Sequence, residues 1–216
     1  MVRLIAFVGF KCSGKNTAAA ALYPYGFVPI SFADALKDTL AAIFCWDREL
    51  LEGISNESRM WREHVDSWWA AKLDIPHFTP RWAMMNIGTE VMRRQFHYDL
   101  WVFNVERRMM MIEAPIVLTD GRFPNEIALA QRYGGQVVRI RREADPAWMP
   151  LANTANFDPR QTERDNARGR LTLAGVHESE YAWVNSAIDH VIENDGTIAD
   201  LHTKVTDWAR CVGSIE

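Results

Sequence analysis

Short hydrophobic runs alternate with longer stretches of helical periodicity along most of the chain. Five of the short runs have the length of buried strands: Leu4 to Val8, Val28 to Phe32, Pro115 to Thr119, Gln136 to Ile140 and His190 to Ile192. Strands that alternate with helices are typical of a parallel sheet with helices on its faces. The pattern therefore predicts an α/β fold.

The predicted helices are longer, and the middle of the chain is almost entirely helical. They span Asn16 to Leu22, Ala33 to Phe44, Arg81 to Phe96, Leu100 to Met111, Asn125 to Tyr133 and Ile198 to Cys211. A charged, tryptophan-rich stretch from Arg48 to Leu73 belongs to the same helical middle. A break at Ile75 to Pro80 separates this stretch from the next helix.

The segment from Arg141 to about Glu180 lacks a clear periodicity. It holds three prolines and many polar residues, and the arginines in its second half are Arg160, Arg164, Arg168 and Arg170. This composition favours a mobile lid over an element of the core.

The composition excludes several classes of protein. At 216 residues, with 48% hydrophobic and 24% charged residues, the chain is long enough for one domain with a well-buried core plus an additional segment. The formal net charge of -4 argues against a broad basic face for a nucleic acid polymer. Any anionic ligand must therefore bind at a local cluster of positively charged residues.

The cysteines and the first hydrophobic run indicate a cytoplasmic protein. The three cysteines are odd in number and lack metal-ligand spacing, which fits a reducing compartment. The first hydrophobic run ends at Lys11, too early for a membrane span, and no small-residue cleavage site follows it. We therefore expect no contact with a membrane.

The stretch GFKCSGKNT, from Gly9 to Thr17, contains the pattern G-x-x-x-x-G-K of a phosphate-binding loop. Gly9, Gly14 and Lys15 hold the fixed positions, directly after a predicted strand and directly before a predicted helix. Glycines let successive amide hydrogens point inward, the helix N-terminus adds partial positive charge, and the lysine adds a full charge. The sequence therefore predicts a cradle for a triphosphate.

Asn16 stands where this pattern has a Ser or Thr whose hydroxyl reaches a magnesium ion. Its amide oxygen can accept hydrogen bonds from metal-bound water, and Thr17 offers a hydroxyl one residue later. We expect Asn16 and Thr17 to hold the metal, partly through water. The loop residues expected at the donor phosphates are Gly9, Lys11, Ser13, Gly14, Lys15, Asn16 and Thr17.

The loop resembles that of the deoxynucleoside monophosphate kinases encoded by bacteriophages, in which Asp commonly stands at the position of Asn16. Further segments are similar to patterns of that family and follow in its order over nearly the whole chain. They are Asn86-Ile87-Gly88-Thr89 with Arg81 upstream and Trp101-Val102 downstream, Thr119-Asp120-Gly121-Arg122 with Glu126, His177-Glu178-Ser179-Glu180, and Val191 to Gly196. Their combination is much more specific than the loop alone.

This chain departs from the family pattern at two positions. Trp82 replaces a basic residue that often follows the position of Arg81, and Met85 stands where Gln is common. Base selection is therefore the family property that is least transferable to this chain.

The resemblance implies a P-loop NTPase fold with three α/β/α layers, formed as a single domain over residues 1–216. Residues 34–111 would form a helical region that binds the acceptor nucleotide, and residues 142–180 would form a lid. The implied reaction transfers a phosphoryl group from ATP, with Mg²⁺, to a deoxynucleoside monophosphate that is dGMP-like or carries one of several bases. The resemblance is also compatible with a homodimer. It implies that the protein lies in the host cytoplasm if a phage encodes it.

Phosphoryl transfer depends mainly on positioning and on neutralising charge around two bound phosphates. Asp120 follows an apolar strand, at the end where open parallel sheets place their ligand contacts. We expect Asp120 to hold metal-bound water or an acceptor group and Arg122 to contact phosphate. Glu126 would orient Arg122 or the acceptor. With Lys15 these are the candidate catalytic residues, although a helix cap for Asp120 and a surface salt bridge for Arg122 remain alternatives.

The candidate acceptor-binding residues lie mostly in the helical middle. Asp34 and Lys37 are one turn apart on one predicted helix, and Arg81 and Gly88 are about two turns apart on another. Packing is an equal alternative for Gly88 and for Trp101, and a surface position for Arg59. The complete set is Lys11, Asp34, Lys37, Arg59, Arg81, Gly88, Thr89, Trp101, Asp120, Arg122 and Glu126.

The lid arginines would supply charge to the donor phosphates when the lid closes. Arg168 is our candidate among them, although a charged loop is usually only solvated. His177 is expected to fix the end of the lid and not to shuttle protons.

Two other classes of function stay open at the level of sequence. A nucleotide-hydrolysing switch or motor would need a positioned water in place of the acceptor cluster. A module that only senses nucleotide would need no catalysis. The presence of Asn16 where the pattern has Ser or Thr supports this alternative. Within the favoured class, a kinase of another small phosphorylated metabolite also stays open.

Overall fold

The structure is a computed structural model that describes residues 3–215. The chain divides into two compact units. The first is built from the residues up to Ser31 together with those from Glu106 onward, and the second from the continuous segment Phe32–Val105. The boundaries predicted for the helical region, residues 34–111, lie close to those of the second unit.

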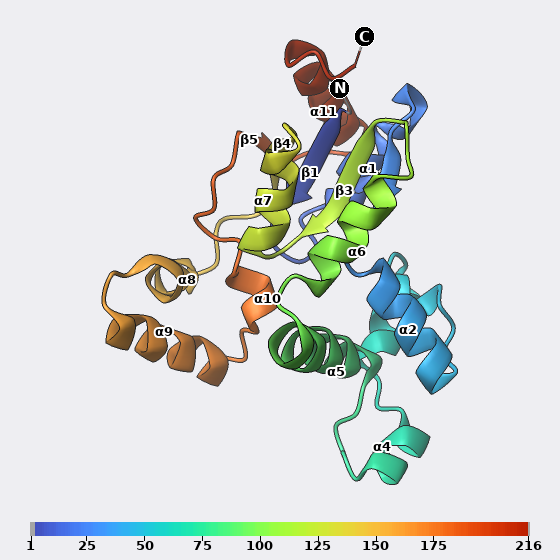
Figure 1. Cartoon of the computed structure of the whole chain (residues 1–216), viewed down its shortest axis with the longest axis vertical. Helices are drawn as coiled ribbons and strands as arrows, with labels where there is room; N and C mark the ends of the chain where they lie inside the picture. The colour runs from blue at the N-terminus through green and yellow to red at the C-terminus, as the bar shows by residue number, and fades with distance from the viewer. Residues whose placement is uncertain (1–2, 216) are drawn as a thin grey trace. The chain divides into compact units, whose positions relative to one another are not determined.

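The first unit contains a sheet of five parallel strands (Figure 1). The strands are β1 (Leu4–Val8), β2 (Val28–Ile30), β3 (Ile116–Gly121), β4 (Gln136–Arg141) and β5 (His190–Glu193). Their order across the sheet is β2-β3-β1-β4-β5. All four neighbouring pairs are parallel, and the phosphate-loop sequence directly follows the central strand. The predicted P-loop α/β fold class is therefore confirmed.

β1 lies at the centre of this sheet and is buried along its whole length. Its sequence, LIAFV, is apolar at every position, as expected for a strand that is covered on both faces. Because the strands are parallel, β1, β2 and β3 end at the same edge of the sheet. Val8 pairs with Gly121, and Ile30 pairs with Leu118. The residues that follow these three strands are thereby brought together.

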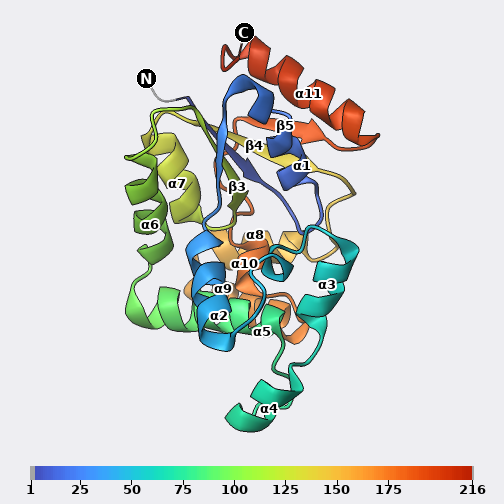
Figure 2. The ribbon, with the colours of Figure 1, turned by 90° about the vertical axis from the view of Figure 1, so that its right-hand side faces the viewer.

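Helices cover both faces of the sheet (Figure 2). On one face, α1 (Lys15–Ala20) lies beside α11 (Ile198–Cys211), and on the other lies α7 (Pro124–Arg132). Thr197 caps the start of α11. Its side chain accepts the N–H of Asp200, and its own N–H is accepted by the Asp200 carboxylate. The core on the α1 and α11 face includes Phe7, Ala18, Leu22, Ile140, Val205 and Trp208.

The segment between β4 and β5 is more regular than its sequence pattern predicted. It forms α8 (Met149–Phe157), α9 (Gln161–Leu173) and the short α10 (Glu178–Tyr181), and α8 packs along α9. In the hairpin formed by α8 and α9 few side chains are buried, and most of them are small. They are Ala152, Ala155, Ala167 and Leu171. Alanines permit close helix packing but produce a weak hydrophobic pattern, which explains why the helices were missed. The role of the segment as a lid stays a prediction.

The second unit is helical, as predicted. It contains α2 (Asp34–Phe44), a 3₁₀ turn (Leu50–Glu52), α3 (Asn56–Glu63), α4 (Ser67–Leu73), α5 (Pro80–Met85) and a π-helix (Asn86–Phe96) that continues α5. α6 (Leu100–Met109) begins in this unit. Buried aromatic residues that include Phe44, Trp46 and Phe78 form its core. No helix among residues 3–215 has the length and hydrophobicity needed to cross a bilayer.

We predict that Phe7→Ala destabilises the protein by about 3–5 kcal/mol, because Phe7 is fully buried in the central strand and its loss leaves a cavity. The free energy of unfolding from urea titrations measures the effect. Leu173→Ala is the control, since Leu173 is 89% exposed and its replacement should change stability by less than about 0.5 kcal/mol. Similar losses in the two variants would contradict this description of the core.

Candidate functional site

The loop after β1 adopts backbone conformations that require glycine at two positions. Gly9 has a φ of +142°, and a Cβ placed on it would lie 2.5 Å from the carbonyl oxygen of Ile140 on β4. Gly14 has a φ of +99°, and its Cβ would lie 2.5 Å from Nδ2 of Asn194. The two glycines of the predicted motif therefore let the chain turn in a space where no side chain fits.

Lys15 folds back into this loop. Its ammonium donates hydrogen bonds to the carbonyl oxygens of Gly9, at 2.9 Å, and of Phe10, at 2.8 Å. Burial lowers the pKa of Lys15 to about 7, and the positive charge of Arg122 acts in the same direction. The carboxylates of Glu180 and Asp120 oppose this shift. A cation that binds carbonyl oxygens in a loop of this kind is well placed to exchange them for phosphate oxygens.

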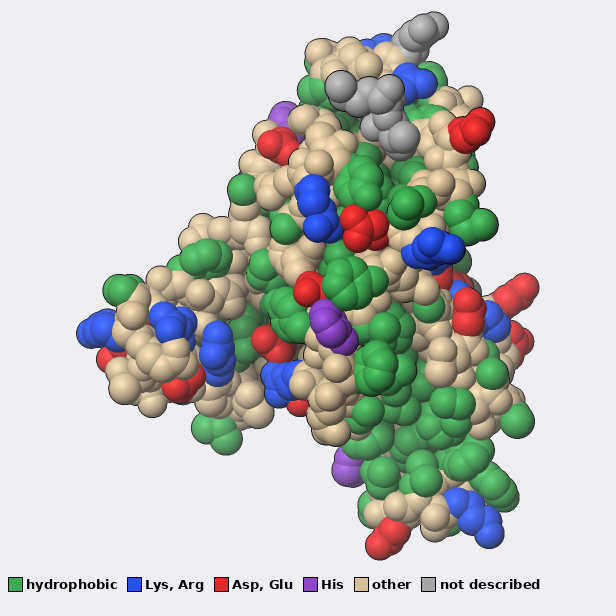
Figure 3. All heavy atoms as spheres, in the orientation of Figure 1, with side chains coloured by type: hydrophobic (Ala, Val, Ile, Leu, Met, Phe, Trp, Pro, Cys, Tyr) green, Lys and Arg blue, Asp and Glu red, His purple; other side chains and the backbone are tan. Residues whose placement is uncertain are grey.

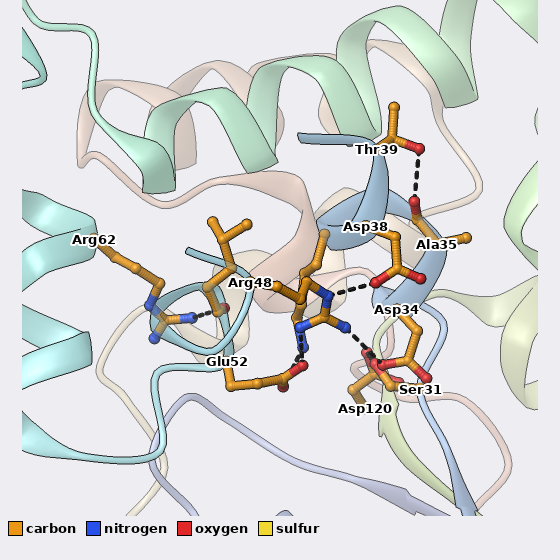
Figure 4. Close-up of polar contacts among 11 residues, drawn as sticks. Ser31, Asp34, Ala35, Asp38, Thr39, Arg48, Glu52, Arg62 and Asp120 are labelled. Carbon is orange, nitrogen blue, oxygen red and sulfur yellow. Dashed lines mark hydrogen bonds and ion pairs between the residues drawn. The ribbon is translucent and has the colours of Figure 1, made fainter. Parts of the chain in front are cut away.

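Asp120 is held by a residue that the sequence did not single out. Its Oδ2 accepts a hydrogen bond of 2.6 Å from the hydroxyl of Ser31 (Figure 4). Ser31 directly follows β2 and Asp120 lies near the end of β3, and these two strands are neighbours in the sheet. The serine thereby fixes the carboxylate at the edge where the phosphate loop begins.

Arg122 contacts the end of the segment between β4 and β5. Its NH1 donates to the carbonyl oxygen of Ser179 at 3.3 Å and lies 3.7 Å from Oε1 of Glu180. Both partners belong to α10. Glu180 also affects the pKa of Lys15, so one carboxylate lies among the two cations of the site.

Glu126 makes local contacts that shape the chain beside Arg122. Its buried Oε2 accepts the backbone N–H groups of Arg122, at 2.7 Å, and of Phe123, at 3.1 Å. These bonds satisfy N–H groups at the start of α7. In these contacts Glu126 orients the backbone that carries Arg122, whereas a direct catalytic role stays a prediction.

Phe10 joins the phosphate loop to the helical hairpin. Its ring lies 5.2 Å from that of Trp148 and 4.9 Å from that of Trp183, both in edge arrangements. The guanidinium of Arg139 lies 5.4 Å from the Phe10 ring and 5.1 Å from the Trp183 ring, and it forms an ion pair with Asp145. Residues from both ends of the segment between β4 and β5 therefore meet at one residue of the loop.

The remaining loop residues differ in exposure. Ser13 is buried, and its hydroxyl is without a hydrogen-bond partner among residues 3–215. Lys11, Cys12 and Asn16 are exposed, and Thr17 is half-buried. The orphaned hydroxyl and the amide and hydroxyl oxygens of Asn16 and Thr17 suit a phosphate-bound magnesium ion, which prefers oxygen ligands and keeps several waters. Within the described residues, no group of three or more His, Cys, Asp or Glu side chains could hold a metal alone.

In the second unit, Lys37 and Arg48 form one ion cluster with three acidic residues. Lys37 is buried and pairs with Glu52 at 2.6 Å. Arg48 contacts Asp38 at 2.5 Å, Asp34 at 3.6 Å and also Glu52 (Figure 4). Partial burial acts to raise the pKa of Glu52, but Lys37 and Arg48 lower it overall. The structure thus brings the predicted pair Asp34 and Lys37 into a network with Arg48, which the sequence did not identify.

The other acceptor candidates of the second unit are engaged in packing or surface contacts. The carbonyl of Gly88 accepts the indole N–H of the buried Trp101 at 2.9 Å, and a Cβ on Gly88 would lie 2.6 Å from Leu36. Thr89 is also buried. Nε of Arg81 lies 3.4 Å from Glu63, and Arg59 donates to Asn56 at 3.0 Å. Their roles toward a ligand stay predictions.

Basic side chains gather over the hairpin of α8 and α9 (Figure 3). Arg168 is exposed on α9 and lies 3.6 Å from Asp165. His177 precedes α10, and its Nδ1 accepts the N–H of Ser179 at 3.2 Å. His177 therefore caps the short helix that presents Glu180, while its role at the end of a lid stays a prediction.

Comparison with known proteins yields one similar curated sequence and several similar folds, while no protein-family model matches the chain. The similar sequence belongs to a protein of Acanthamoeba polyphaga mimivirus named "Putative deoxynucleotide monophosphate kinase". The two are 28% identical over an alignment of 179 residues, and the match covers 72% of this chain and 85% of that protein. Dephospho-CoA kinase from Campylobacter jejuni is 14% identical with a TM-score of 0.44, and 98% of each chain is covered. Shikimate kinase from Aquifex aeolicus is 13% identical with a TM-score of 0.42, covering 97% of this chain and 99% of that one.

We predict that Lys15 titrates with a midpoint near 7 in the ligand-free protein, because it is buried and lies near Arg122. The ammonium is charged below this pH and neutral above it, so affinity for phosphate should fall as the pH rises from 7. The ¹³Cε resonance of Lys15, assigned by its loss in Lys15→Arg, measures the midpoint. A midpoint above about 9, close to that of a solvated lysine, would contradict the burial of this ammonium.

Proposed function

We propose that this protein transfers a phosphoryl group from ATP to a deoxynucleoside monophosphate, as a precursor step of DNA synthesis. The observation that carries the proposal is the buried Lys15 ammonium inside a glycine-shaped loop, at the edge of a parallel sheet where Asp120 and Arg122 also lie. The name of the mimivirus relative supports the choice of acceptor.

The donor phosphates would bind in the loop. Lys15 exchanges the carbonyl oxygens of Gly9 and Phe10 for phosphate oxygens, and the anion raises its pKa again, so that the lysine is fully charged when ATP is bound. Inward backbone N–H groups and the N-terminus of α1 provide further positive potential. The exposed Lys11 at the loop surface would add a further positive charge.

Mg²⁺, when bound with ATP, neutralises charge on the phosphates during transfer. Asn16 and Thr17 would hold it through their side-chain oxygens, partly by way of water. Asp120, oriented by Ser31, would accept hydrogen bonds from a water molecule or from the acceptor.

The acceptor needs no general base. A nucleotide phosphate has a second pKa of about 6 and is largely a dianion at neutral pH. Arg122 would contact the phosphates that are brought together, and Glu126 holds the backbone of Arg122 in place. We assign binding of the acceptor nucleotide to Lys37, Arg81 and the other candidates of the second unit. Among the residues of the hairpin, we assign contact with the donor phosphates to Arg168.

We predict that ADP release from ATP and Mg²⁺ depends on one or a few deoxynucleoside monophosphates. A coupled assay with a panel of deoxynucleotides and ribonucleotides, and a blank without acceptor, measures this. Turnover equal to the blank for every acceptor would contradict the proposal and favour ATP hydrolysis. Tight ATP binding with no turnover would favour a sensing module.

Lys15→Ala should reduce turnover at least about 100-fold, because it removes the charge closest to the transferred group. Initial rates at saturating acceptor measure the loss. Lys72→Ala provides a control, since Lys72 lies on α4 of the second unit beside Trp68. Turnover of Lys15→Ala within a few-fold of the unchanged protein would argue against this site.

Asn16→Ala should raise the Mg²⁺ concentration needed for half-maximal turnover, because the metal loses one side-chain oxygen in its surroundings. A magnesium titration at fixed ATP measures the shift. An unchanged titration would remove the role we give to Asn16.

A further inference from the structure

Asn194 reaches the phosphate loop from a distant part of the chain. It directly follows β5, and its backbone N–H donates to the carbonyl oxygen of Arg141 at 2.7 Å, which extends the contact between β4 and β5. Its side-chain Nδ2 donates to the carbonyl oxygen of Ser13 at 2.8 Å. A side chain after the edge strand therefore binds the backbone of the loop directly.

The bonded carbonyl belongs to the peptide that links Ser13 to Gly14. This peptide is trans, as are the others in the described part of the chain, so its C=O and N–H groups point in opposite directions. With the carbonyl held by Asn194, the N–H of Gly14 points away from Asn194. Anion-binding loops need this arrangement of inward amides and outward carbonyls.

Gly14 is free to adopt other conformations unless something restrains it. Glycine visits both positive and negative φ at little cost, and the flanking peptide rotates with that change. Asn194 supplies a restraint of two kinds, because its Nδ2 both bonds to Ser13 and packs against Gly14. A Cβ on Gly14 would lie only 2.5 Å from that nitrogen.

The residues around Asn194 are themselves well fixed. Arg141 and Glu193 form a two-bond ion pair across β4 and β5. The ammonium of Lys204 on α11 donates to the carbonyl oxygen of Glu193 at 3.0 Å. The position of Asn194 is therefore set by the sheet and by α11, independently of the loop.

We propose that Asn194 is a positioning residue for the phosphate loop, which fixes the peptide between Ser13 and Gly14 so that the Gly14 N–H is offered to a bound phosphate. This inference rests on the proposed function in one respect, namely that ATP supplies the phosphate. It goes further by giving a residue outside the loop motif control over the affinity of the loop.

The test compares phosphate affinity in Asn194→Ala and Asn194→Ser with that of the unchanged protein. Calorimetry measures binding of ATP and, separately, of inorganic tripolyphosphate, which has neither base nor sugar. We expect both ligands to bind about tenfold more weakly to both variants, the effect of one lost hydrogen bond in a folded protein. Asp195→Asn is the matched control and should bind both within about twofold, because Asp195 is exposed and contacts Lys204.

A second measurement needs no ligand. The amide resonance of Gly14 should shift and broaden in Asn194→Ser, since its peptide loses the restraint. Thermal unfolding identifies variants that lose stability without losing affinity.

Three outcomes would overturn the inference. They are unchanged affinity for both ligands, weaker binding of ATP with unchanged binding of tripolyphosphate, and a lower Tm with unchanged affinity. The first and third deny an effect on the loop, and the second indicates a contact with the nucleoside.

The experiment is independent of the acceptor, so it separates the two claims. If no monophosphate supports turnover but both ligands bind the variants weakly, the proposed function fails and the inference stands. If a deoxynucleotide supports turnover and the affinities are unchanged, the inference fails and the proposed function stands.

Discussion

The turn of the chain at Gly9, directly after the central strand β1, determines the rest of the site. At Gly9 the carbonyl oxygen of Ile140 lies where a Cβ would be, so the chain can turn only with a glycine at a positive φ. The turn presents the carbonyl oxygens of Gly9 and Phe10, and the Lys15 ammonium binds both. The central strand and its neighbour β4 therefore create the place where backbone carbonyl oxygens hold a buried cation.

Phe10 gives this loop a mechanical connection to the hairpin of α8 and α9. Its carbonyl binds Lys15, while its ring packs between Trp148 and Trp183, which stand before α8 and after α10. Arg139 is buried against two of these rings and pairs with Asp145. The residue whose carbonyl binds Lys15 is thus also the residue that both ends of the segment between β4 and β5 contact.

Much of the fold could be predicted because its hydrophobic periods are strong. The run LIAFV of β1 is apolar at every position, and the predicted bounds of α11 agree with those of the helix. The alanine-based contacts of α8 and α9 left no comparable pattern. The backbone of the phosphate-loop sequence was predictable because a motif encodes it, as the positive φ of Gly9 and Gly14 shows. Ser31 beside Asp120 was not, because that contact depends on the order of β2 and β3, which no local pattern encodes.

The strand order also governs how the chain folds during synthesis. β1 and β2 are made first, yet each pairs with β3 and not with the other, and the whole segment Phe32–Val105 is made before β3. That segment has its own core and can fold early, whereas the apolar β1 stays without its partners until the ribosome has passed Gly121. The nascent chain therefore carries an unpaired hydrophobic strand while the whole segment between Val8 and Ile116 is made, a period in which chaperones protect such segments from aggregation.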